Sequence, residues 1–251
     1  MNAYILSHNG LGDNISMIGA VNFLLKHYIK IYFLCKKRYE LNVQLLHNNC
    51  NLITVPIDEN NEFNHCKEII INVDQINNDI YICGWCHTSY LSSKITNTNV
   101  LNHIKNNIDI KYNHIFDFYN GIGLDTSIYI NYFNIQSTTL SNQYYYKIKN
   151  YNIIFAHTQG SNRSIDITNI MDLFINDTNY IIICPNKNMY NIDHIHYNLS
   201  NTYINLPVAY YIDIIKHSKE IHVIDSCFSC IVYPLQLSNV LNNSLVKIYE
   251  L

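Results

Sequence analysis

The chain has 251 residues, of which 48% are hydrophobic and 13% aromatic, and this much apolar material excludes a disordered chain. The net charge is -3, with 16 Lys and Arg and no basic run, so neither nucleic acid nor an anionic membrane surface is the expected partner. No apolar stretch is long enough to span a bilayer, and residues 1–7 lack the basic start of a secretory signal. We therefore expect a cytoplasmic protein whose 8 cysteines are reduced.

The first half of the chain alternates between strand-like and helix-like patterns. We expect strands at residues 3–7, 29–34, 52–55, 69–73 and 80–83, and helices at 15–28 and 41–46. Residues 97–112 read as helical and polar, and a further helix over 116–125 stops at a glycine. Residues 132–146 are aromatic and irregular, so we expect them to connect two lobes.

A second series of the same kind begins at residue 152. Strands are expected at 153–156, 180–184 and 220–224, with helices at 165–174, at 209–218 and after residue 225. Strands alternating with helices indicate parallel sheets. The predicted fold class is therefore α/β, with two Rossmann-like lobes at 1–147 and 148–251 and a cleft between them.

The first motif is Gly10-Leu11-Gly12-Asp13, followed by Asn14, in the turn between the first strand and the first helix. Glycines allow the backbone to bend tightly and approach a ligand, and a carboxylate at the mouth of a helix suits a general base. The alternative is that Asp13 only caps the helix. The spacing is not that of the dinucleotide-binding fingerprint, because no third glycine follows.

The second motif runs from Ile221 to Cys230, where small hydroxyl residues end a strand and open a helix. The side chain of Ser226 and the amides of Ser226, Cys227 and Phe228 can hold a diphosphate. Asp225 can cap the turn or accept a hydrogen bond from a sugar hydroxyl. An ordinary helix cap is the alternative for Asp225 and Ser226.

The third candidate is the loop that opens the second lobe, with Lys187 on the same edge of its sheet as a weaker candidate. Guanidinium suits bidentate phosphate binding, although Arg163 can equally be a solvated surface residue. Polar turns at the carboxyl edge of one parallel sheet are expected to converge on a ligand. The candidate residues of this loop are Gln159, Gly160, Ser161 and Arg163.

Two Cys-x-x-Cys pairs, at Cys83/Cys86 and Cys227/Cys230, raise the alternatives of a redox pair, a haem attachment or a zinc site. Because each pair adjoins a buried strand, we interpret them as small buried thiols and expect no metal. No Asp-x-Asp occurs in the sequence, so a donor diphosphate would be neutralised by helix N-termini and by Arg163 or Lys187.

The sequence resembles GT-B type glycosyltransferases, nearest to the heptosyltransferase family and related bacterial and viral sugar transferases. The resemblance rests on residues 10–13, on 222–226 with Ser229, and on 155–161. It implies two Rossmann-like lobes, with acceptor contacts by the first, including Gly10 and Asn14, and a nucleoside-diphosphate sugar held by the second. It also implies metal-independent inversion, no cofactor, Asp13 as catalytic base, and donor contacts by Gly12, Asp225, Ser226, Cys227 and Ser229.

The sequence departs from the family at three places. Cys227 stands where the family has glycine and Cys230 where it has histidine, and only Arg163 remains of a basic string after the second-lobe loop. The expected function is a glycosyltransferase acting on a glycan or glycoconjugate hydroxyl. The alternatives are a nucleotide-sugar epimerase, a non-catalytic nucleotide- or carbohydrate-binding module, and a zinc-stabilised interaction protein.

Overall fold

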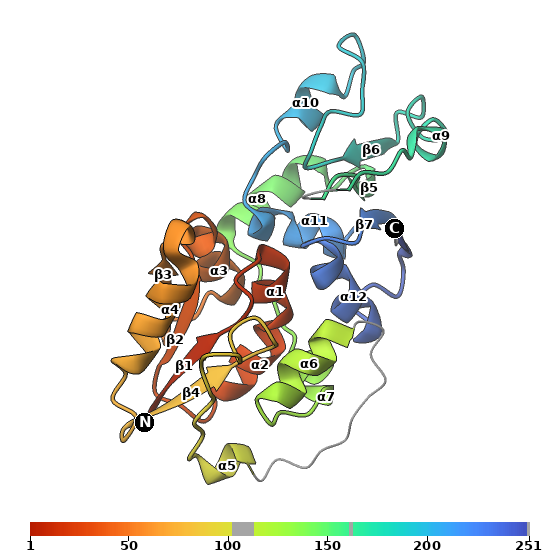
Figure 1. Ribbon diagram of the computed structural model, residues 1–251. Coiled ribbons are helices and arrows are strands. Elements are labelled where there is room, and N and C mark those ends of the chain that lie inside the picture. Colours follow the sequence, from red (N-terminus) through yellow and green to blue (C-terminus); the bar gives the residue numbers. More distant parts are fainter. Residues whose placement is uncertain (102–112, 161–162, 250–251) are drawn as a thin grey trace. The chain divides into compact units, whose positions relative to one another are not determined.

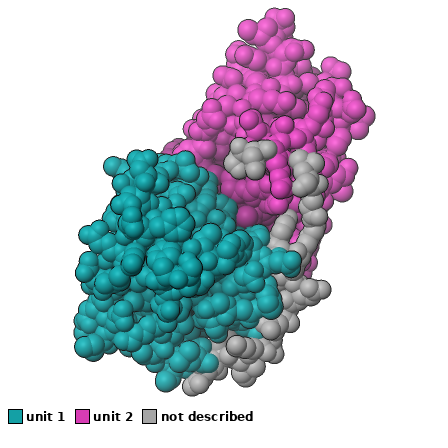
Figure 2. All heavy atoms as spheres, viewed as in Figure 1, with its two compact units in different colours: residues 1–136 teal, residues 137–251 magenta. Residues whose placement is uncertain are grey.

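The computed structural model describes residues 1–101, 113–160 and 163–249 (Figure 1). The chain forms two compact units, unit 1 (Met1–Gln136) and unit 2 (Ser137–Leu251), coloured separately in Figure 2. The boundary that the sequence places after residue 147 lies later in the chain than this division. The reason is that helix α8 (Thr139–Ile148) packs against α11 (Ile212–Lys216) of unit 2.

The core of unit 1 is a sheet of four parallel strands in the order β3-β2-β1-β4. Its centre is fully buried, which explains why the strands read as near-continuous apolar runs in the sequence. In the register, Leu6 of the central strand faces Leu34 on one side and Ile82 on the other. The strands are β1 (Asn2–Leu6), β2 (Ile31–Lys36), β3 (Leu52–Ile57) and β4 (Asn78–Ile82).

Short helices link and cover these strands. They are α1 (Leu11–Ser16), α2 (Ile18–Leu24), η1 (Lys37–Tyr39), α3 (Glu40–His47), η2 (Glu59–Asn61), α4 (Glu62–Ile71), α5 (Thr98–Leu101), α6 (Asn113–Gly121) and α7 (Ser127–Asn131). The strand expected at 69–73 is wrong, because most of it lies in α4. Cys66, Ile70 and Val73 recur at helical spacing and pack on the sheet, whereas Ile71 points to solvent.

The helix expected over 15–28 is interrupted at Met17, which separates α1 from α2. A buried side chain from a distant part of unit 1 causes this interruption. The hydroxyl of Tyr119 accepts from the Ala20 amide at 3.0 Å and donates to the Ser16 carbonyl at 2.9 Å. In a continuous helix the Ala20 amide would donate directly to the Ser16 carbonyl. The Tyr119 hydroxyl is inserted between these two groups and replaces that one helical hydrogen bond. The sequence of the helix itself contains no sign of this break.

Unit 2 repeats the architecture with four parallel strands in the order β6-β5-β7-β8. Strand β8 was not predicted from the sequence, because it is a partly exposed edge strand without a clear apolar pattern. The strands are β5 (Asn152–His157), β6 (Tyr180–Ile183), β7 (Glu220–Ile224) and β8 (Leu245–Tyr249). The α/β class with parallel sheets predicted from the sequence is therefore confirmed.

The helices of unit 2 differ from expectation more than its strands do. They are α8, α9 (Thr168–Met171), α10 (Tyr197–Asn201), η3 (Val208–Tyr211), α11 and α12 (Ser229–Leu237). The interpretation of residues 132–146 as irregular is wrong from residue 139 onward. There Thr138 and Ser141 cap the start of α8 reciprocally, and Ser141 is also held by Asp213 of α11.

In each sheet the order in which the chain adds strands changes direction beside the first strand of the unit, which is β1 in unit 1 and β5 in unit 2. In unit 1 the chain runs outward from β1 to β2 and β3 and then returns to the other side of β1 with β4. In unit 2, β7 returns to the other side of β5 in the same way. The loops after the two strands of such a pair diverge and leave a crevice in which α/β proteins bind ligands. Within the described residues, no helix is both long and apolar enough to cross a membrane.

Candidate functional site

In unit 1 the predicted motif follows β1 at the point of strand reversal. Helix α1 begins at Leu11 with Gly10 as its N-cap, so the alternative that Asp13 occupies the N-cap position is wrong. Asp13 lies in the first turn, and its Oδ2 accepts a hydrogen bond from the Gly10 amide at 3.1 Å. The carboxylate therefore does close the helix start, but this bond occupies only one of its two oxygens.

A buried polar cluster beside this turn was not predicted from the sequence. Asn9 has a left-handed backbone (φ 65°) and is fully buried. Its Nδ2 donates to Glu62 Oε1 at 3.0 Å and lies 3.3 Å from His87 Nε2. Glu62 in turn forms an ion pair with Lys36 at 2.9 Å. This cluster ties together the ends of β1, β2 and β4 and the start of α4.

Two amide atoms in this region have no partner within the part of the chain that the structure describes. They are the Oδ1 of Asn9 and the Nδ2 of Asn14, and both side chains are almost completely buried. The Oδ1 of Asn14, by contrast, accepts from the Ser7 hydroxyl at 3.1 Å. Buried polar atoms are normally satisfied, so an acceptor and a donor remain for a water or ligand atom near the predicted acceptor residues Gly10 and Asn14.

His8, the second residue after the end of β1, was also missed. Its Nε2 accepts hydrogen bonds from the Trp85 amide at 2.9 Å and the Cys86 amide at 3.2 Å. Its ring meets the rings of Trp85 and Phe118 edge-on. Burial lowers the pKa of His8, and the carboxylate of Asp13 opposes this shift. The only sequence signal was its place at a strand end.

The Cys-x-x-Cys pairs lie in surroundings that disfavour the thiolate form. None of the 8 cysteines, all of which lie in the described residues, forms a disulfide. Burial raises the pKa of the Cys83 and Cys86 thiols, and it raises that of Cys227 to about 11. Reactive redox cysteines have lowered pKa values instead. Among the residues placed by the structure, no three His, Cys, Asp or Glu side chains are grouped as metal ligands.

In unit 2 the loops after β5 and β7 meet at its point of strand reversal. A Cβ on Gly160 would lie 3.8 Å from the Asp225 carbonyl and 3.9 Å from the Ser226 Cβ. Ser226 Oγ lies 3.0 Å from His157 Nδ1 and donates to the Ile224 carbonyl at 3.1 Å. The structure thus brings Gly160, Asp225 and Ser226 together as predicted.

His157 was not singled out in the sequence beyond marking a loop start. A hydroxyl has one proton, so both bonds of Ser226 are satisfied when neutral His157 donates from Nδ1. Burial lowers the pKa of His157 to about 4, which keeps it neutral at physiological pH. His157 therefore fixes the orientation of the Ser226 hydroxyl.

The turn that opens α12 satisfies several of its own groups. The Ser226 amide donates to Ser229 Oγ at 3.0 Å, and the Phe228 amide points to Ser226 Oγ at 3.4 Å. Ser229 Oγ also bonds the exposed Asp225 carboxylate at 3.1 Å. A diphosphate bound by these amides, as the sequence predicts, would have to replace these internal bonds. Cys227 lies between them and is half-buried.

The remaining predicted donor residues lie around the same edge. Gln159, Arg163 and Lys187 are exposed, while Ser161 lies outside the described residues. The loop is folded back on itself, because the Gly160 amide donates to the Arg163 carbonyl at 2.8 Å. Asn186, from the loop after β6, accepts from the Gln159 amide at 3.3 Å, which holds two neighbouring loops of the edge together.

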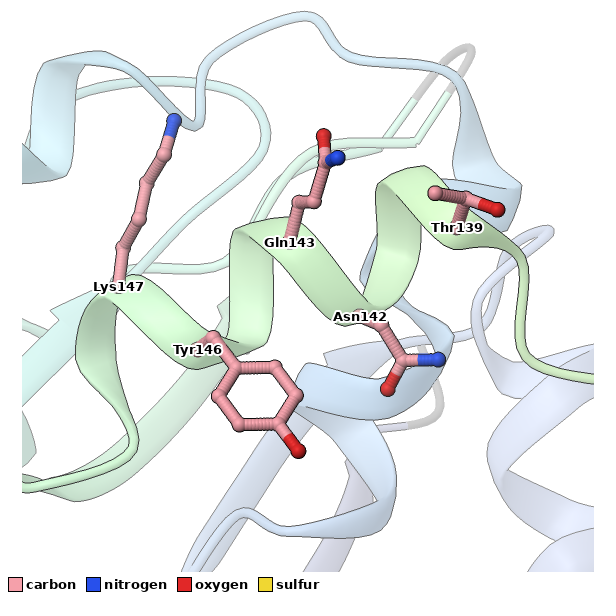
Figure 3. A pocket seen from close by; sticks show the side chains of 5 residues that line it. All are labelled: Thr139, Asn142, Gln143, Tyr146 and Lys147. Carbon is pink, nitrogen blue, oxygen red and sulfur yellow. The ribbon is translucent and has the colours of Figure 1, made fainter.

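A separate hollow lies along α8 and contains none of the predicted residues (Figure 3). Its labelled side chains all come from one helix, with Gln143 and Lys147 on one side and Asn142 and Tyr146 on the other. Ligand sites usually converge polar groups from several elements, so we assign no function to this hollow.

No protein-family model and no curated protein matches the sequence. Solved structures do match in fold. The glycosyl transferase family 9 from Veillonella parvula DSM 2008 aligns with a TM-score of 0.55 at 12% identity, over 100% of this chain and 86% of that one. The E. coli ADP-heptose LPS heptosyltransferase II aligns with a TM-score of 0.57 at 10% identity, over 99% of this chain and 90% of that one. The fold implied by the resemblance in the sequence is thereby confirmed.

Proposed function

Because the chain has the fold of family 9 glycosyltransferases and heptosyltransferases, we propose that it is a glycosyltransferase. It moves a sugar from a nucleoside-diphosphate sugar to a hydroxyl of a glycan or glycoconjugate. The observation that carries the proposal is the placement of the motifs. The Gly10–Asp13 turn follows β1, and Gly160 and Ser226 follow β5 and β7, so each motif lies at a strand reversal.

Asp13 is the general base of the proposed reaction. The acceptor oxygen attacks the anomeric carbon, its proton passes to Asp13, and the bond from that carbon to the phosphate oxygen breaks. The nucleoside diphosphate leaves with the bonding electrons, and a single displacement of this kind inverts the anomeric carbon. The hydrogen bond from Gly10 holds one carboxylate oxygen in place and leaves the other to take the proton.

The donor diphosphate is assigned to unit 2. The turn at Ser226, Cys227 and Ser229 lies next to Gly160, where no side chain obstructs the backbone, and His157 holds the Ser226 hydroxyl in place. The amides and hydroxyls of this turn donate to the diphosphate by exchanging the internal bonds that they make in its absence. The exposed cations Arg163 and Lys187 offset the negative charge that develops on the leaving group. The positive charge of Lys187 also helps to lower the pKa of Asp166, although hydrogen bonds from Thr168 are the larger cause. In this proposal the protein supplies the counter-charge without a cofactor or a metal.

Release of nucleoside diphosphate tests the proposal directly. A panel of ADP-, UDP-, GDP- and dTDP-sugars is incubated with the protein and with glycan acceptors, and a true donor is also expected to raise the melting temperature. Asp13→Asn should reduce turnover by at least about 100-fold, within the range of general-base contributions, and leave donor binding unchanged. Glu68→Gln, an exposed carboxylate on α4 of unit 1, is the control and should remain active.

The same experiment separates the alternative functions. Donor consumption without any acceptor would indicate an epimerase on this fold. Donor binding without product, over the whole acceptor panel, would indicate a non-catalytic binding module. If no nucleotide sugar raises the melting temperature or is consumed, the proposal is wrong.

A further inference from the structure

The loop Cys83–Gly84–Trp85–Cys86–His87 has an arrangement that the donor chemistry does not use. Its backbone holds His8, because the amides of Trp85 and Cys86 both donate to His8 Nε2. Gly84 is required for this contact. Its φ is +75°, and a Cβ there would lie 2.2 Å from His8 Nε2 and 2.6 Å from a ring carbon of Phe118.

This arrangement fixes which nitrogen of His8 carries the proton. A nitrogen that accepts two N–H groups cannot carry hydrogen, so neutral His8 is protonated on Nδ1. The ring is also held edge-on between Trp85 and Phe118, at centroid distances of 4.2 and 4.6 Å. His8 is therefore a pre-oriented hydrogen-bond donor at the point where the strand order of unit 1 reverses.

Trp85 supplies an apolar surface beside this donor. It is the only tryptophan of the chain, and 59% of it is exposed although its backbone is fixed on His8. Exposing so large an aromatic ring has a cost in water, and an exposed tryptophan whose backbone is fixed is typical of a binding surface. Asp13 lies close by, since its charge acts electrostatically on both His8 and Cys86.

A rigid aromatic ring, a fixed N–H donor and a carboxylate together match the chemistry of a sugar. A pyranose has an apolar face of C–H groups that packs on an aromatic ring, and a rim of hydroxyls that accept and donate hydrogen bonds. We propose that Trp85 and His8 form a carbohydrate subsite of unit 1 that binds the acceptor sugar, with Trp85 beneath its apolar face and His8 Nδ1 donating to a hydroxyl oxygen. The inference rests on the proposed glycosyltransferase function.

The sole tryptophan allows this subsite to be tested by its own fluorescence. Methyl hexopyranosides and a methyl heptopyranoside are titrated into the wild-type protein up to about 50 mM, a range that saturates a site with a dissociation constant of about 1 mM. We expect a saturable change of Trp85 emission for at least one of these sugars. Addition of ADP or UDP alone should leave the emission unchanged.

Variants then separate the subsite from the rest of the protein. Saccharide binding, followed by saturation-transfer NMR, should weaken at least about tenfold in Trp85→Ala, which corresponds to loss of about 1.4 kcal/mol. His8→Gln should weaken it at least about fivefold, because glutamine can still accept from the two amides but lacks the Nδ1 donor. Phe116→Ala, an exposed aromatic of the same unit, is the control and should bind normally.

Two results would overturn the inference. One is the absence of any emission change with all saccharides, together with unchanged acceptor KM in Trp85→Ala. The other is quenching of Trp85 by nucleotides instead of sugars. In either case, a melting temperature that still rises with donor, and continued release of nucleoside diphosphate, would leave the proposed function standing.

Discussion

Acidification should destabilise each unit through one buried histidine that stays neutral. His47 in unit 1 and His157 in unit 2 are only 7% and 5% exposed. Burial lowers the pKa of each from 6.5 to about 4. The unfolded chain therefore takes up the proton first as the pH falls, and stability is lost between about pH 6.5 and pH 4.

The size of the effect follows from this difference. At about 1.4 kcal/mol per pH unit, each histidine lowers the free energy of unfolding by about 3 kcal/mol when the loss is complete. At pH 5 the loss is about 2 kcal/mol for each. Because the two residues belong to different units, the losses should add. Burial also lowers the pKa of His87 and His222, which changes stability in the same direction.

Urea unfolding at pH 7 and pH 5, followed by circular dichroism, measures these losses. His47→Phe keeps an aromatic ring against Phe33 and removes the titrating group, and the Nδ1 of His47 has no partner among the described residues that would be lost. His157→Asn retains a donor near Ser226. Each variant should recover about 2 kcal/mol of the loss at pH 5. If His47→Phe loses as much stability as wild type between these pH values, His47 is not held neutral by the fold.

Three further substitutions test individual contacts. Gly84→Ala should destabilise unit 1 by about 2–4 kcal/mol, because the backbone would be strained and the new Cβ would collide with His8. Urea unfolding followed by Trp85 emission measures this loss, and an unchanged midpoint would contradict the geometry. Asp79→Asn should cost about 3 kcal/mol, because the buried carboxylate accepts from Tyr28 and three other donors; a loss below 1 kcal/mol in thermal unfolding would show that these bonds are not needed. Ser226→Ala should weaken donor binding about five- to tenfold in calorimetric titration and also cost about 1–3 kcal/mol of stability, because the buried His157 Nδ1 loses its hydrogen-bond partner; equal affinity would remove the Ser226 hydroxyl from the donor site.

Much of the fold could be predicted from the sequence because strand burial is a local signal. The strands that contain Ile5, Phe33, Phe155 and Ile221 are buried on both faces, so each is an apolar run that ends at polar or turn residues. Their carboxyl ends coincide with the Gly10 and Ser226 motifs. The alternation of strands and helices then required parallel sheets, and the solved structures share that fold.

Helix limits depended on contacts that are distant in the sequence. Tyr119 interrupts the first helix from about a hundred residues away, and Asp213 holds the start of α8. The three isoleucines at 69–71 favour a strand by propensity, yet Cys66 and Ile70 fit the sheet only as one face of a helix.

The candidate site shows the same division. The sequence alone was enough to select Asp13, Gly160 and Ser226 as candidates, because glycines and small polar residues between a strand and a helix mark a turn that can approach a ligand. The pairing of His8 with Trp85 could be found only in the folded chain, since these residues lie 77 positions apart in the sequence and meet because β4 pairs with β1. Strand order is a property of the whole sheet, and no local pattern of residues encodes which loops it brings together.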